Sequence, residues 1–124
     1  MAFGGQVAIV GIVVEGIRDQ LEHYMDLLSA RQKLVASNIA NADTPGYKSK
    51  DIDFQFEFMS QIKNGSPNVV ETQGLVVKND GNNVSMDREA RLLAENSLRF
   101  NMASALIKTQ LKIMTDAIQE GKSG

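Results

Sequence analysis

The 124-residue chain lacks cysteine and tryptophan, and aromatic residues make up only 6% of it. Without cysteine, the chain has no disulfide bonds, no thiolate metal site and no cysteine nucleophile. With so few rings, we expect no large rigid core built on aromatic side chains. The length suffices for one domain but not for two, so we expect residues 1–124 to form a single domain.

Clustered positive charge is also missing. The net charge is -2, and the 13 Lys and Arg residues are scattered along the chain rather than gathered in a block. A protein that binds DNA or RNA neutralises phosphates with grouped Lys and Arg side chains. We therefore expect no nucleic acid among the partners of this chain.

Candidate catalytic residues are few. His23 is the single histidine, and it lies beside Glu22 and Asp26 with no nucleophile or second metal ligand at a useful spacing. We expect a solvated histidine on a helix. Asp51 and Asp53 alternate with apolar residues, which is typical of the wet face of a strand.

The segment Asp80–Asn83 has the composition of a calcium loop, but the residues after it do not fit. Counting from Asp80, the sixth residue is Ser85 where a calcium loop needs glycine, and the twelfth is Arg91 where it needs glutamate. The segment is predicted to be a plain turn. The sequence therefore predicts no enzyme, no cofactor, no metal site and no small-molecule substrate.

A continuous apolar run extends from Val7 to Val14. It is too short to span a bilayer, which takes about 20 residues. No Lys or Arg precedes Arg18, so the run lacks the positive start of a secretory signal, and we expect no cleavable signal peptide. Two interpretations remain open. The run is either a strand or helix end buried against a neighbouring segment, or a segment covered only after assembly.

A first long helix is predicted from about Gly16 to Ala42. Apolar residues recur every seven positions along it, which is the pattern of a coiled-coil seam. These seam residues are Val14, Leu21, Leu28, Val35 and Ala42. Arg31 and Asn38 interrupt the seam, and buried polar groups of this kind cost stability unless they are paired. The Pro45–Gly46 pair ends the helical pattern.

A second long helix is predicted from about Met86 to 120, with Ser85 as its N-cap. Its seam alternates steps of four and three residues and consists of Met86, Ala90, Leu93, Ser97, Phe100, Ser104, Ile107, Leu111, Met114 and Ile118. A second apolar surface is formed by Leu92, Met102, Ala103 and Leu106. One stripe is enough to pair two helices, so the second surface indicates a second partner.

The middle segment, about residues 47–83, has the chemistry of turns and short strands. Val69–Thr72 and Leu75–Val77 are predicted to form a hairpin around Gln73–Gly74. Phe54, Phe56 and Phe58 alternate, so an extended segment would carry all three rings on one face. The predicted fold is mainly α: two long terminal helices pair as an antiparallel coiled coil, with a short irregular or β-hairpin middle.

Two stretches resemble one known family. Residues 36–47, with the sequence ASNIANADTPGY, resemble the N-terminal signature of flagellar rod, hook and related axial proteins. Residues 80–89 and 93–100 are similar to the C-terminal block of a proximal rod subunit of that family. The apolar run at Val7–Val14 departs from the polar, helix-forming start expected of the family.

The resemblance implies a structural subunit of the proximal rod of the flagellar basal body. Such a subunit polymerises through its terminal helices into a tube that works as a drive shaft for motility. The implied partners are other copies of the chain, the other proximal rod subunits, the rod-base adaptor and the flagellar export gate. The implied location is the periplasmic rod, reached through the flagellar type III export apparatus.

The residues expected at assembly contacts come from both seams and from the turn after the first helix. They are Leu21, Leu28, Val35, Asn38, Ile39, Asn41, Pro45, Gly46, Tyr47, Leu93, Asn96, Phe100, Ile107, Leu111, Met114 and Ile118. Asn38 and Asn41 lie three residues apart, so they share a helix face, where their amides can pair across helices or help to end the helix. We expect Tyr47 to cover the turn with its ring.

Two other functions fit parts of the sequence. A small cytoplasmic coiled-coil adaptor or export chaperone would also have two amphipathic helices and no active site, but it would have no need of the asparagine-rich stretch at residues 36–47. A membrane-associated protein could use the apolar run Val7–Val14 as its contact with lipid.

Overall fold

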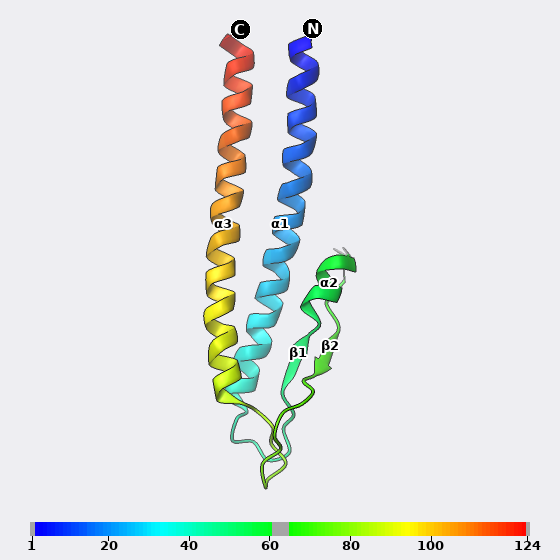
Figure 1. Ribbon diagram of the computed structural model, residues 1–124, viewed down its shortest axis with the longest axis vertical. Coiled ribbons are helices and arrows are strands. Elements are labelled where there is room, and N and C mark those ends of the chain that lie inside the picture. The colour runs from blue at the N-terminus through cyan, green and yellow to red at the C-terminus, as the bar shows by residue number, and fades with distance from the viewer. Residues whose placement is uncertain (1, 61–64, 124) are drawn as a thin grey trace.

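The computed structural model describes residues 2–60 and 65–123, and within them the chain is mainly helical (Figure 1). Its elements are α1 (Ala2–Ala40), β1 (Lys50–Ile52), α2 (Phe54–Ser60), β2 (Val69–Glu71) and α3 (Met86–Ser123). The two long helices lie side by side and run in opposite directions, so both ends of the chain lie at the same end of the molecule. The predicted antiparallel helix pair is confirmed. No helix in this part of the chain has the length and apolarity that crossing a membrane requires.

The first helix is longer than predicted. It begins at Ala2 rather than near Gly16, so the apolar run continues the helix and the strand interpretation is wrong. No proline interrupts residues 2–40, and once a helix exists each further residue adds a hydrogen bond. Most of the run is not covered within the chain: Ile9, Ile12 and Val13 are 63%, 71% and 53% exposed, and Val14 is buried.

The row of α3 that packs against α1 is not the predicted one. Leu92, Asn96 and Ala103 are buried, and Gln110 and Ala117 continue their row at half-buried positions. The predicted seam lies one residue away and points largely to solvent, whereas Leu92 and Ala103 had been assigned to the second surface. The small side chain of Ala103 and the bond from Asn96 to Gln32 explain the difference, because they allow close approach and pair the buried amide.

In the middle segment, the expected strand at Val69–Glu71 is present, but its partner is not the expected one. β2 pairs antiparallel with β1, with Asp51 opposite Val70, and not with Leu75–Val77. Ile52 is only 4% exposed, so β1 is fixed by burial and offers β2 an edge to pair with. The two strands form a two-stranded sheet beside α1 (Figure 1).

The three phenylalanines lie on a short helix, α2, and not on an extended segment. Phe54 and Phe58 are one helical turn apart, and both rings meet the ring of Tyr24 edge-on, at centroid distances of 5.3 and 5.6 Å. Asp53 caps this helix, because its carboxylate accepts the backbone NH of Phe56 at 3.1 Å. The wet-strand interpretation of Asp53 is therefore wrong.

Candidate functional site

The two stretches that carry the family resemblance meet at one end of the helix pair. Residues 36–47 end α1, and residues 80–89 begin α3, so each lies where a long helix meets the middle segment. The backbone NH of Gly46 donates to the carbonyl of Asp80 at 2.9 Å, and the NH of Asn83 donates to the carbonyl of Tyr47 at 3.3 Å. We call residues 36–51 and 80–89 together the corner.

Asn82 closes the end of α1. Its side chain is fully buried, and its Nδ2 donates to the carbonyls of Asn41 and Thr44, both at 2.9 Å. Both carbonyls lie in the turns that follow α1, where they also accept the backbone NH groups of Thr44 and Tyr47. Asn82 therefore ties these turns to the segment that leads into α3. Sequence reasoning treated Asn82 only as a turn residue. The doubled asparagine after Asp80–Gly81, more than a turn needs, was the available signal.

Two glycines allow the stretches to approach this closely. Gly46 and Gly81 have φ angles of 76° and 86°, in the left-handed region that favours glycine. A Cβ atom added to Gly81 would lie 3.3 Å from the Cα of Gly46. Gly81 lies in the turn predicted from Asp80, whose carboxylate accepts the backbone NH of Asn82 at 3.0 Å. The predicted turn is confirmed.

Asn38 joins α1 to both β1 and α3. Its side chain is fully buried and makes four hydrogen bonds. Its Nδ2 donates to the carbonyl of Lys50 at 2.8 Å and to Oε1 of Glu89 at 3.1 Å. Its Oδ1 accepts from the NH of Lys50 and from the hydroxyl of Tyr47, both at 3.0 Å. Pairing of Asn38 across elements is therefore confirmed. Asn41 instead bonds the carbonyl of Ser37 within its own helix end.

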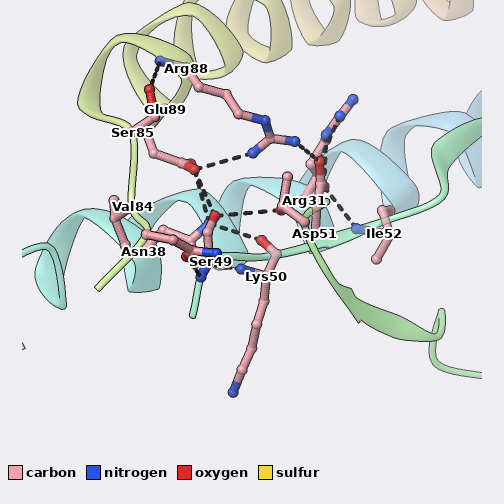
Figure 2. A network of polar contacts seen from close by, with 12 residues as sticks. Arg31, Asn38, Ser49, Lys50, Asp51, Ile52, Val84, Ser85, Arg88 and Glu89 are labelled. Atoms are coloured by element: carbon pink, nitrogen blue, oxygen red, sulfur yellow. Dashed lines mark hydrogen bonds and ion pairs between the residues drawn. The ribbon is translucent and has the colours of Figure 1, made fainter. Parts of the chain in front are cut away.

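An ionic network of Arg31, Asp51 and Arg88 lies beside Asn38 (Figure 2). Arg31 donates to Asp51 through two nitrogens, Nε to Oδ1 at 3.0 Å and Nη2 to Oδ2 at 2.8 Å, in a bidentate pair. Arg88 donates to Oδ2 of the same carboxylate at 2.5 Å. Asp51 is only 6% exposed, so its assignment to a wet strand face is wrong. The signal for it was Arg31 in the seam, since a buried guanidinium needs a carboxylate nearby.

Glu89 connects the ionic network to the hydrogen bonds of Asn38. Its side chain is fully buried, and its Oε1 accepts from Asn38, from the hydroxyl of Ser49 at 3.3 Å and from Arg88 at 3.2 Å. In the sequence it was only an acidic residue in the first turn of a helix. The start of that helix is as predicted, because the NH of Arg88 donates to the Ser85 hydroxyl at 3.3 Å.

The surroundings of Asp51 act on its pKa in opposite directions. Burial raises the pKa of this carboxyl group, but the hydrogen bonds from Arg31, from the NH of Ile52 and from Arg88 favour its ionised form. The bonds prevail, and the pKa of Asp51 is held below its ordinary value of 3.8. The ionised form is therefore bound more strongly by the folded chain than by the unfolded chain.

This shift predicts a loss of stability in acid. With a depressed pKa in the folded state, the contribution of Asp51 is complete above the unfolded value of about 3.8 and is lost as the pH falls through the folded value. Urea unfolding followed by circular dichroism between about pH 6 and pH 2 measures it. The variant Asp51→Asn, which has no proton to gain there, is expected to show a shallower decline. Equal slopes for the two proteins would contradict the prediction.

His23 lies away from the corner and is not solvated, contrary to expectation. It is only 9% exposed, its Nε2 lies 3.2 Å from the carbonyl oxygen of Glu57, and its ring stacks on Phe58 at 5.9 Å between centroids. It therefore helps to hold α2 against α1. Within residues 2–60 and 65–123, no three His, Cys, Asp or Glu side chains are grouped so that they could hold a metal ion.

The residues expected at assembly contacts fall into three groups. Those buried within the chain are Leu28, Val35, Asn38 and Asn96. Those half-buried are Leu21, Ile39, Asn41, Tyr47, Ile107 and Met114. Those exposed are Pro45, Gly46, Leu93, Phe100, Leu111 and Ile118. The corner brings together Asn38, Asn41 and Tyr47, while the exposed residues of α3 lie along its outward face.

Comparison with known proteins identifies the family. The model of the flagella basal body rod protein family matches residues 25–48. The flagellar basal body rod protein FlgB of Escherichia coli (strain K12) is 34% identical over 122 residues, covering 78% of this chain and 88% of the relative. FlgB of Salmonella typhimurium (strain LT2) is 34% identical over 125 residues, with the same coverage. FlgB of Cereibacter sphaeroides is 33% identical over 124 residues, covering 84% and 97%. The chain therefore belongs to the FlgB family of flagellar basal body rod proteins.

Proposed function

We propose that the chain polymerises through its terminal helices, with copies of itself and with the other proximal rod subunits, into the tube that acts as the drive shaft of the flagellum. Family membership makes the chain a structural protein of the basal body, which assembles with other rod components and is not an enzyme. Residues 1–124 act as one axial-protein unit, and this unit assembles through its two terminal helices.

The observation that carries the proposal is the outward face of α3. Leu93, Phe100, Leu111 and Ile118 follow one another along this face and are 40%, 39%, 44% and 45% exposed. Beyond Leu92, the row that faces α1 contains Asn96, Ala103, Gln110 and Ala117, which are smaller or more polar. The single chain thus covers its less apolar row and leaves the more apolar one in solvent. A continuous apolar face of this kind is typical of a surface that meets another protein.

The end of the helix pair that holds the two chain termini supports the same proposal. Ile9, Ile12, Val13 and Ile17 of α1 are 63%, 71%, 53% and 42% exposed, and α3 ends beside them (Figure 1). Apolar residues on both helices therefore lie at the end opposite the corner. In a helical assembly, contacts of this kind join different surfaces of successive copies and continue without closing.

The proposal extends to the surroundings of the rod. We place the assembled chain in the periplasmic part of the basal body, after export by the flagellar type III apparatus. We propose that its further partners are the rod-base adaptor and the export gate.

The variant carrying both Phe100→Ser and Leu111→Ser tests the assembly surface. Both side chains are largely outward, so the isolated variant is expected to keep its helical circular dichroism and its unfolding midpoint. Polymer recovered by sedimentation is expected to fall roughly tenfold or more, because each lost apolar contact weakens association by about 1 kcal/mol.

The matched control carries Lys108→Ser and Lys112→Ser, two exposed charged residues of the same helix. It is expected to polymerise like the wild type and to co-purify with basal bodies to the same extent. If the apolar variant polymerised and entered basal bodies as the wild type does, the outward face of α3 would not be the assembly surface. If the wild-type chain stayed soluble and absent from basal bodies, the proposed function itself would fail.

A further inference from the structure

A groove between α1 and α3 is lined by a residue with a buried polar atom that has no hydrogen-bond partner within residues 2–60 and 65–123. The groove has a volume of about 380 Å³ and is lined by Leu28, Ser29, Gln32, Asn96, Ser97, Phe100 and Asn101. Asn96 is only 3% exposed, and its Nδ2 donates to Oε1 of Gln32 at 3.2 Å. Its Oδ1 is buried and accepts no hydrogen bond from any residue that the structure describes. A buried carbonyl oxygen left in this state is costly, so a donor that reached it would be bound favourably.

Asn96 lines the groove, and because the terminal torsion of asparagine is broad, its amide can turn to meet an occupant. The groove also has apolar walls, from Leu28 and from Phe100, which is 39% exposed. Its occupant must therefore combine one amide or hydroxyl group with apolar side chains on the same face.

One face of this chain has that composition. Gln6 is the only polar residue between Ala2 and Val14, and its side chain is exposed. Ile9, Val13 and Ile17 follow it at steps of three, four and four residues, so the four side chains share one face of α1. The three apolar residues are 63%, 53% and 42% exposed, so this face is free in the single chain.

We propose that the groove of one copy receives the Gln6–Ile17 face of a neighbouring copy, with the Gln6 amide hydrogen-bonded to Asn96. This inference rests on the proposed function and names the contact by which successive copies join. A primary amide carries both donors and an acceptor, so Gln6 satisfies the Asn96 oxygen and is itself satisfied in the groove. The apolar side chains of the face cover Leu28 and Phe100.

The contact cannot form within one chain. Gln6 and Gln32 lie on the same helix, about 39 Å apart at a rise of ~1.5 Å per residue, and Asn96 contacts Gln32. A bond between Gln6 and the groove therefore joins two copies. It joins two different surfaces, so each copy still offers one free groove and one free face, and the chain of contacts continues.

Cysteine cross-linking tests the contact directly, because the natural chain has no cysteine. Copies carrying Gln6→Cys are mixed with copies carrying Asn101→Cys, at the exposed edge of the groove, and oxidised under assembly conditions. Disulfide-linked heterodimers are expected, and the double variant Gln6→Cys/Asn101→Cys is expected to give a ladder of higher oligomers. The control mixes Gln6→Cys with Gln73→Cys, an exposed position in the middle segment, and is expected to give no product above background.

Two substitutions test the hydrogen bond. Asn96→Leu and Gln6→Leu are each expected to lower polymer yield roughly tenfold. Gln6 is exposed, so Gln6→Leu is expected to keep the unfolding midpoint of the isolated chain, whereas Asn96→Leu also removes the bond to Gln32 and is expected to lower that midpoint. The double variant is expected to lose no more than either single variant, since both remove the same bond. Wild-type polymer without a 6–101 cross-link, or Gln6→Leu polymer at the wild-type yield, would overturn this contact and leave the proposed function standing. A wild-type chain that neither polymerises nor enters basal bodies would overturn both.

Discussion

Replacing Asp51 with alanine is expected to lower the free energy of unfolding by about 3–5 kcal/mol, the largest effect of any single substitution in the corner. The reason is what the change leaves behind. Arg31 and Arg88 have side chains only 15% and 17% exposed, and both depend on the Asp51 carboxylate. Without it, two guanidinium groups stay largely buried, and the remaining carboxylate, on Glu89, is near only one of them.

Urea unfolding at neutral pH measures this effect, with Asp116→Ala as the matched control. Asp116 is an exposed acidic residue of α3, so its loss is expected to change stability by less than about 0.5 kcal/mol. If Asp51→Ala shows no cooperative unfolding transition, the variant has lost the whole free energy of unfolding of the chain. That result agrees with the prediction. A change below about 1 kcal/mol would show that the two arginines do not depend on Asp51.

The second large effect is expected at Asn38. Asn38→Ala removes four hydrogen bonds in a buried site and leaves both backbone groups of Lys50 and the Glu89 carboxylate short of a partner. Each such group costs about 1–3 kcal/mol, so a loss of about 3 kcal/mol or more is expected. Amide hydrogen exchange is expected to show the Lys50 NH losing protection, because that NH donates to the Asn38 side chain.

Asn41→Ala is the comparison that makes this test specific. Asn41 lies three residues further along and belongs to the same signature, but its side-chain bonds to Ser37 and Thr44 are local and exposed. Its replacement is expected to cost about 1 kcal/mol or less. Equal losses for the two variants would mean that the signature works as a helix end and not as a junction between elements.

The fold could be predicted where the pattern was long and regular. The seam of α1 follows from apolar residues that recur every seven positions. The antiparallel direction is the one that needs the least span between the two helices. The row of α3 that faces α1 could not be predicted in the same way, because the best apolar row is outside. Hydrophobic periodicity identifies the rows of apolar residues that become buried. It does not show whether a row is buried within the same chain or against another chain.

The corner was predictable only in part, for a related reason. The sequence identified Arg31 and Asn38 as polar residues in a buried seam, and hence as residues that need partners. Their partners, Asp51 and Glu89, lie 20 and 51 residues further on and looked like ordinary surface acids. Likewise, the three phenylalanines fit a strand by alternation, and only the Tyr24 ring and the Asp53 cap made the helix the better choice.

The position of the corner also sets an order of events for the folding chain. Its bonds join residues 41 and 51 positions apart, so the loop of the middle segment must close before they form. Every further contact between α1 and α3 spans a longer stretch of sequence, and it becomes easy only after the pair nearer the corner is in place. The helices therefore close from the corner toward the two termini. At the end of the pair that holds the two termini, α1 and α3 pair last and separate first. Their contacts with each other are therefore weakest where exposed apolar residues are available to a neighbouring copy.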